Sequence, residues 1–140
     1  MKAITIKQPW ASLIALGEKK FETRSWQTKH RGQIAIHAGK SVDKKAFETF
    51  AEVFKDQGIK TVDELPVGAV IATVNLINCH KVINEFPIEA WTTGPNIRGR
   101  EFYFGDYTEG RYAWELSNLQ VLAEPVPAKG KLSLWEWNEE

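Results

Sequence analysis

A short stretch near the N-terminus, GEKKFETRSW, has residue types and spacing that suit a charged binding or catalytic site. Lys19 falls at the end of an expected helix, and an expected strand follows it. Because successive side chains of a strand point to opposite faces, Lys20, Glu22 and Arg24 are expected to share one face. Trp26 lies on the same face at the end of the strand. Cations there could donate to phosphates or base oxygens, while the carboxylate could accept from a base amino group.

The same alternation of charge has a second interpretation. A solvent-exposed edge strand often carries charges that discourage aggregation, and pairs of opposite sign contribute only a few tenths of a kcal/mol there. The neighbourhood favours a site instead, because Gly17 permits a tight turn before the strand and an aromatic residue, Trp26, ends it.

The elements that position this stretch can be predicted from hydrophobic periodicity. A strand is expected over residues 3–7, and a helix is expected to start near Pro9 and to end at Gly17. The alternating segment 32–39 is expected to be a strand that pairs with the motif strand. The segment 41–58 predicts one helix with Ser41 as its N-cap.

The remainder of the chain predicts mostly strands. The nearly continuous apolar run within 65–82 indicates a buried central strand. A long loop is expected over 92–99 and a strand over 111–122, and the segment 124–137 is expected to be a Pro-marked loop followed by a last short strand. The fold class expected is α+β: a small closed sheet of five or six strands with flanking helices, forming a single domain over residues 1–140.

Composition limits the classes of function. The 140 residues have a formal net charge of zero, yet residues 1–40 carry eight Lys or Arg against two acids. This argues against binding by bulk charge and for a local basic surface. The single Cys79 and the lack of a secretion signal lead us to expect a cytoplasmic protein, and the longest apolar run, GAVIATV, is too short to span a membrane.

The motif and its flanks resemble a known family. Gly17, Lys19, Glu22 and Arg24 fit the Gly-x-Lys-x-x-Glu-x-Arg pattern of the ASCH domain, a branch of the PUA-like β-barrels. The segments KQPWASLIALG, RGQIAIHAGK and KGKLSLWEW extend the resemblance over nearly the whole chain. It implies a β-barrel with a cleft beside the motif strand and a role in RNA binding or nucleotide chemistry.

The first hypothesis is a binding module for RNA or a nucleotide-like small molecule, with no cofactor. The expected ligand contacts are Lys19, Lys20, Glu22, Arg24 and Trp26, with a basic rim of Lys29, Arg31 and Lys40. His37 is also an expected ligand contact, because the resemblance places the end of its strand near the cleft. Arg98 and Arg100 are expected contacts because glycines flank them in a loop that could act as a lid. The aromatic residues that could stack on a base are Trp26, Trp91, Tyr103, Tyr107 and Trp135.

The second hypothesis is a hydrolase that acts on a modified nucleoside or RNA, similar to an amidohydrolase or a nuclease. One ASCH branch resembles an amidohydrolase with a Thr nucleophile, a Lys and a Glu. Lys19 matches the Lys, but Glu22 stands at the nucleophile position, and segment 68–79 has no acid to supply the Glu. A different hydrolysis would use Glu22 as general base and Lys19 or Arg24 to stabilise charge.

A third possibility is a domain that binds a protein segment or a small anion. No oligomeric state can be assigned from the sequence. A metal site is not expected, because His30, His37 and His80 lack ligand spacing with Cys79.

Overall fold

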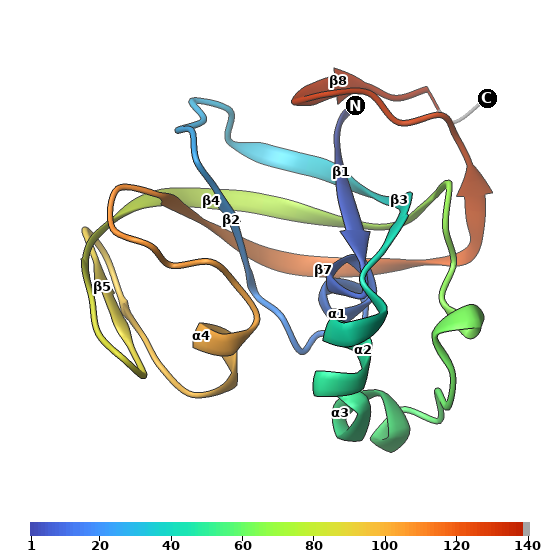
Figure 1. Ribbon diagram of the computed structural model, residues 1–140. Helices are drawn as coiled ribbons and strands as arrows, with labels where there is room; N and C mark the ends of the chain where they lie inside the picture. The colour runs from blue at the N-terminus through green and yellow to red at the C-terminus, as the bar shows by residue number, and fades with distance from the viewer. Residues whose placement is uncertain (139–140) are drawn as a thin grey trace.

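One mixed sheet organises the molecule (Figure 1). The structure is a computed structural model that describes residues 1–138. Its strands are β1 (Lys2–Gln8), β2 (Phe21–Arg24), β3 (Gly32–Val42), β4 (Ala69–Glu85), β5 (Ala90–Thr92), β6 (Asn96–Ile97), β7 (Tyr112–Pro127) and β8 (Leu134–Glu136). Its helices are α1 (Trp10–Ala15), α2 (Lys44–Thr49), α3 (Ala51–Asp56), α4 (Arg100–Tyr103) and the 3-10 turn η1 (Val62–Glu64).

The strand order is β2-β7-β4-β3-β1-β8, and β5 and β6 extend the sheet beside β4. Eight strands therefore occur in the described chain, not five or six. The closed barrel is not confirmed, because the order is a path with two ends and no ladder joins β2 to β1 or β8 within residues 1–138. The mixed α+β class is confirmed.

The predicted pairing of the motif strand with segment 32–39 is wrong. β3 pairs in parallel with β1 and antiparallel with β4, while β2 pairs with β7 so that Glu22 lies opposite Trp114. The reason is burial on both faces: every residue from 34 to 39 is buried, so β3 requires a neighbour on each side. The charged β2 occupies an end of the sheet instead.

The single helix expected over 41–58 is also wrong, because β3 continues into this segment and two short helices follow it. Asp43, not Ser41, is the N-cap of α2, and its Oδ1 accepts a hydrogen bond of 2.9 Å from the backbone N–H of Ala46. Phe50 leaves helical geometry, with φ −102° and ψ 20°, and separates α2 from α3.

The loop expected over 92–99 contains part of a small hairpin, in which β5 and β6 pair through Ala90 opposite Ile97. Other predictions are confirmed. β1 and α1 lie where expected, Gly17 ends that segment with φ +77°, and β4 occupies the middle of the sheet.

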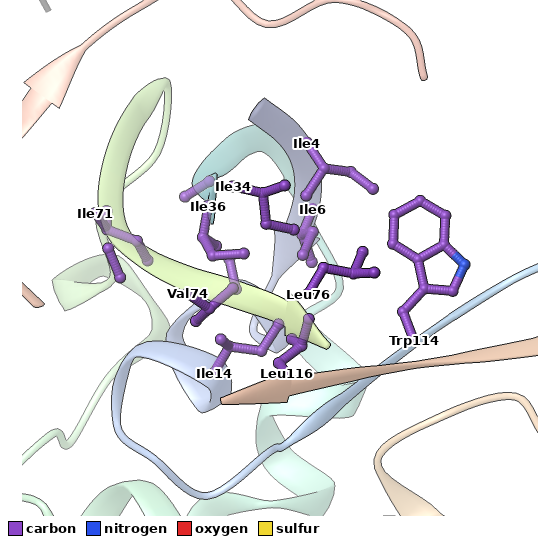
Figure 2. Packing of buried hydrophobic residues seen from close by; sticks show 13 residues of the cluster. Ile4, Ile6, Ile14, Ile34, Ile36, Ile71, Val74, Leu76, Trp114 and Leu116 are labelled. Atoms are coloured by element: carbon purple, nitrogen blue, oxygen red, sulfur yellow. The ribbon is translucent and has the colours of Figure 1, made fainter. Parts of the chain in front are cut away.

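The main core lies between the sheet and α1, and β1, β3, β4 and β7 contribute to it (Figure 2). Its larger buried side chains are Ile4, Ile6, Ile14, Ile34, Ile36, Ile71, Val74, Leu76, Trp114 and Leu116. Trp114 is fully buried, and the ring of Trp26 packs edge-on against it at a centroid distance of 4.8 Å. This contact ties the end of the motif segment to the core.

Trp114→Ala should lower the free energy of unfolding by about 3–5 kcal/mol, because it removes a fully buried aromatic side chain from the core. Trp91→Ala is the matched control: Trp91 is 41% exposed, so its loss should cost less than about 1 kcal/mol. Urea unfolding followed by circular dichroism measures both values. Equal losses would show that Trp114 does not hold the core.

Candidate functional site

A cleft of about 590 Å³ lies at the opening of the sheet, between β1 and β2. Tyr103 at the end of α4 and the residues that follow it line one side of the cleft. Its lining residues are Thr5, Ile6, Lys7 and Trp10 from the first strand and helix, Lys19, Glu22, Thr23 and Arg24 from the motif, and Tyr103, Phe104, Gly105, Asp106 and Arg111 from the later chain. Three of the motif's charged side chains therefore share the cleft.

The carboxylate of Glu22 is the centre of the charged network. Its Oε1 lies 3.5 Å from the Nζ of Lys19, and its Oε2 accepts a hydrogen bond of 3.0 Å from the Nε of Arg24. Only 10% of the Glu22 side chain and 1% of the Lys19 side chain are exposed. The Nζ of Lys19 also donates to the carbonyl of Phe21. Charges removed from water in this way are stabilised only while they stay paired.

Arg24 connects β2 to β1 across the opening of the sheet. Its guanidinium donates from Nη2 to the backbone carbonyl of Thr5 over 2.9 Å. β8 covers the edge of β1 only along residues 2–4, so the carbonyl of Thr5 lies just beyond the paired region. A side chain from β2 therefore replaces the backbone ladder that a closed sheet would have at this position.

A second group of polar residues lies close to the motif but does not line the cleft. The Oε1 of Glu101 accepts a hydrogen bond of 2.8 Å from the backbone N–H of Lys20, while its Oε2 is buried and has no hydrogen-bond partner within residues 1–138. Burial raises the pKa of the Glu101 carboxyl, although the charge of Lys19 opposes this effect. Burial, followed by the nearby charges of Glu101 and Glu22, raises the pKa of the Tyr107 hydroxyl.

The mouth of the cleft combines cations with aromatic surface. Lys7 is exposed, Tyr103 is 57% exposed and Trp10 is half-buried. The Nε of Arg111 lies 3.5 Å from the Oδ2 of Asp106. The hydroxyl of Thr108 donates to this carboxylate, which is the main reason that the pKa of Asp106 is lowered.

Two motif residues lie elsewhere than predicted. Lys20 is exposed and lies outside the cleft, because β2 begins only at Phe21 and Lys19 turns inward in its place. Trp26 packs on Trp114 and does not line the cleft.

The outer predicted residues are not gathered at the cleft. The Nη1 of Arg31 donates to the backbone carbonyl of Thr28, and Lys29 is exposed in the same connection. Arg98 pairs with Glu89 at 2.7 Å, and Arg100 lies 3.6 Å from Glu18. His37 is buried and lies in a different groove. Of the aromatic candidates, Tyr103 lines the cleft and Trp26, Trp91, Tyr107 and Trp135 do not.

Sequence reasoning missed Lys7, Trp10, Asp106 and Arg111 as cleft residues. Trp10 is spaced from Leu13 and Ile14 as an apolar residue of a helix that faces the core. Lys7, Asp106 and Arg111 come from segments whose position depends on the tertiary fold. Among residues 1–138, no cluster of three His, Cys, Asp or Glu could hold a metal ion. No helix in that part of the chain is long and apolar enough to cross a membrane.

Glu22→Gln should lower the free energy of unfolding by about 3–5 kcal/mol, because it leaves the buried ammonium of Lys19 without its carboxylate partner. Lys19→Met should cost less, since Glu22 keeps Arg24. In the double variant the two effects should fail to add by about 0.5–3 kcal/mol. Urea unfolding of all four proteins measures this coupling, and additive losses would contradict the pairing.

Glu101→Gln should change how stability depends on pH. The raised pKa means that the folded protein holds the Glu101 proton more tightly than the unfolded chain does, so this contribution is complete below the ordinary value of 4.5 and declines as pH rises through the folded value. Gln cannot ionise and still accepts from Lys20. The stability of the variant relative to wild type should therefore increase as pH rises above the ordinary value of 4.5. An exposed control, Glu124→Gln, should show no such trend.

Comparison with known proteins agrees with this architecture. A solved structure of a mutant ASCH protein from Zymomonas mobilis superposes with a TM-score of 0.56 over 99% of this chain and 91% of that chain. The two sequences are 19% identical, so the likeness concerns the fold alone.

Two curated relatives are more similar in sequence. Activating signal cointegrator 1 of Homo sapiens is 35% identical over 139 residues, and the protein of that name from Mus musculus is 32% identical over 139 residues. Each match covers 95% of this chain but only 22% of the relative, so the chain corresponds to about a fifth of their length. The family model of the ASCH domain matches residues 4–126. The chain belongs to the ASCH domain family.

Proposed function

We propose that this domain binds RNA by holding one nucleotide unit in the cleft between β1 and β2. The observation that carries the proposal is the combination, in one cleft, of the aromatic surfaces of Trp10 and Tyr103 with the cations Lys7 and Arg24. Proteins that bind single-stranded nucleic acid combine stacking surfaces with positive charge in this way. Family membership supports the proposal, because the ASCH resemblance implies RNA binding or nucleotide chemistry.

The charged residues have different roles in this proposal. Lys19 is too buried to be the main ligand contact, so it acts by orienting Glu22. Glu22 in turn holds the guanidinium of Arg24, whose side chain is 25% exposed and faces the cleft. Arg24 and Lys7 then donate to phosphate or base oxygens. A ligand bound here would meet an oriented guanidinium, and preorganisation of this kind reduces the entropic cost of binding.

The peripheral residues remain part of the proposal with a lesser role. Lys20, Lys29 and Arg31 are exposed near the motif strand and its following connection, where they could contact a longer ligand. Arg98 and Arg100 would first have to release Glu89 and Glu18. The family resemblance implies a closed barrel, and in such a barrel the cleft would lie where β1 and β2 approach each other.

A hydrolase is the second candidate. The pair that a general-base reaction would use is present, since Glu22 lines the cleft next to Lys19. Binding is favoured because both carboxylate oxygens of Glu22 already face cations, so neither oxygen is free to accept a hydrogen bond from an attacking water. Mass analysis of RNA recovered after incubation separates the two functions.

A cytoplasmic location suits both the binding function and the hydrolase function, because Cys79 is a partly exposed free thiol.

Tyr103→Ala should weaken binding of a single-stranded RNA about five- to a hundred-fold, which corresponds to a stacking free energy of about 1–3 kcal/mol. Trp91→Ala is the matched control, because Trp91 is also an exposed aromatic residue but lies outside the cleft. Fluorescence anisotropy at fixed salt gives both affinities. The cleft assignment is wrong if Trp91→Ala loses affinity and Tyr103→Ala does not.

A further inference from the structure

A second groove, of about 950 Å³, lies on the other side of Thr5. Its walls come from Thr5 in the middle of β1, the second half of β3, the turn before β4, and the end of β7 with the connection to β8. Figure 1 shows β1 with the β2 and α4 side of the sheet to its left and the chain leaving β7 to its right. Thr5 lines both the cleft and this groove, so the two adjoin at a single residue of β1.

The charge of the groove is of one sign. Lys40, Lys129 and Lys131 line it, all three are exposed, and no Asp or Glu is among the lining residues. None of these lysines forms an ion pair within the part of the chain that the structure describes. The cleft differs in this respect, because Glu22 and Asp106 there already occupy nearby cations. The groove therefore holds the larger uncompensated positive charge.

Hydrogen bonds hold the walls of the groove in place. The Nε2 of His37 lies 2.7 Å from the carbonyl oxygen of Ala128, which can only accept, so this nitrogen donates. Its Nδ1 lies 3.1 Å from the hydroxyl of Thr5, and that hydroxyl also accepts from the Nε1 of Trp135. His37 thereby joins β3 to the loop that carries Lys129 and Lys131.

The loop approaches the sheet closely because residue 130 is glycine. A Cβ at Gly130 would lie 2.6 Å from the hydroxyl of Thr5 and 2.8 Å from the His37 ring, closer than real Cβ contacts allow. On the opposite wall, the stem of Lys40 packs against Gly68. The three ammonium groups thus project from walls that are fixed by packing and hydrogen bonds, not from a free loop.

From these observations we infer that the groove binds phosphate groups of the same RNA strand whose nucleotide occupies the cleft, with Lys40, Lys129 and Lys131 as the phosphate contacts. This inference rests on the proposed function of the cleft. Ammonium groups bind phosphate as point charges without reading bases, so the groove contributes affinity and orientation while the cleft selects the nucleotide. A strand that crosses Thr5 connects the two.

The test compares the wild type with Lys40→Gln/Lys129→Gln/Lys131→Gln. Lys44→Gln/Lys45→Gln/Lys55→Gln is the matched control, because it removes the same charge from exposed lysines of α2 and α3. The ligands are a mononucleotide and an RNA of about twelve nucleotides, within the usual footprint of a small single-strand-binding domain. Binding is measured between about 50 mM and 200 mM salt. Urea unfolding checks that each variant is folded.

For the long RNA, affinity should fall as salt rises in both the wild type and the groove variant. Because the wild type makes three more phosphate contacts, its affinity should fall by a factor about twenty times larger over this salt range. The control variant should behave as wild type, and mononucleotide binding should be the same in all three proteins. Equal salt dependence in the groove and control variants would overturn the groove and leave the cleft intact. Binding of the long RNA without the mononucleotide, lost in the groove variant, would support the groove and overturn the cleft. No binding of either ligand by wild type would overturn both.

Discussion

The pairing of one buried carboxylate with two cations holds the site together. Glu22 faces Lys19 through one oxygen and Arg24 through the other, and Arg24 continues to the carbonyl of Thr5 across the opening of the sheet. Removing Glu22 leaves the buried ammonium of Lys19 without an anion, whereas Glu22 keeps one cation when either Lys19 or Arg24 is removed. The motif is therefore first a structural device. Glu22 and Arg24 share a face of β2, and Lys19 reaches Glu22 from the turn after α1. The chemistry of the motif depends on this arrangement of the three side chains.

The position of the cleft follows from the topology of the sheet. Long central strands pair along most of their length, while the ends of the path are short: β2 has four residues and β8 has three. Short end strands cannot complete a ladder, so an opening remains between β2 and β1. The chain that follows β6 covers this opening from the side and supplies Tyr103 and Arg111 to it. A charged site thus forms where backbone pairing ends, with the apolar core directly beneath it.

The sequence predicted this fold well where a local pattern decided the outcome. The apolar run of β4 and the turn at Gly17 are of that kind, and the motif's Lys19, Glu22 and Arg24 do meet at a cleft. Predictions failed where distant segments decided. The strand that pairs with β2 comes from about ninety residues later, as Glu22 opposite Trp114 shows, and periodicity carries no information on such pairing. Lys20 was misplaced because β2 begins only at Phe21, so the alternation of the strand does not extend to Lys20.

The contact between Arg24 and Thr5 has a mechanical consequence. A strand within a ladder moves only when several backbone hydrogen bonds break together, whereas β2 is bonded to one neighbour and is joined to β1 by a side chain. At this point the two walls are therefore joined by the hydrogen bond from Arg24 to Thr5, and beneath it by the apolar packing of Ile4, Ile6 and Trp114. Under the proposed function, a cleft built in this way would admit ligands of different width and would select among them by charge and by stacking. Strict size selection would require a closed ladder at this position.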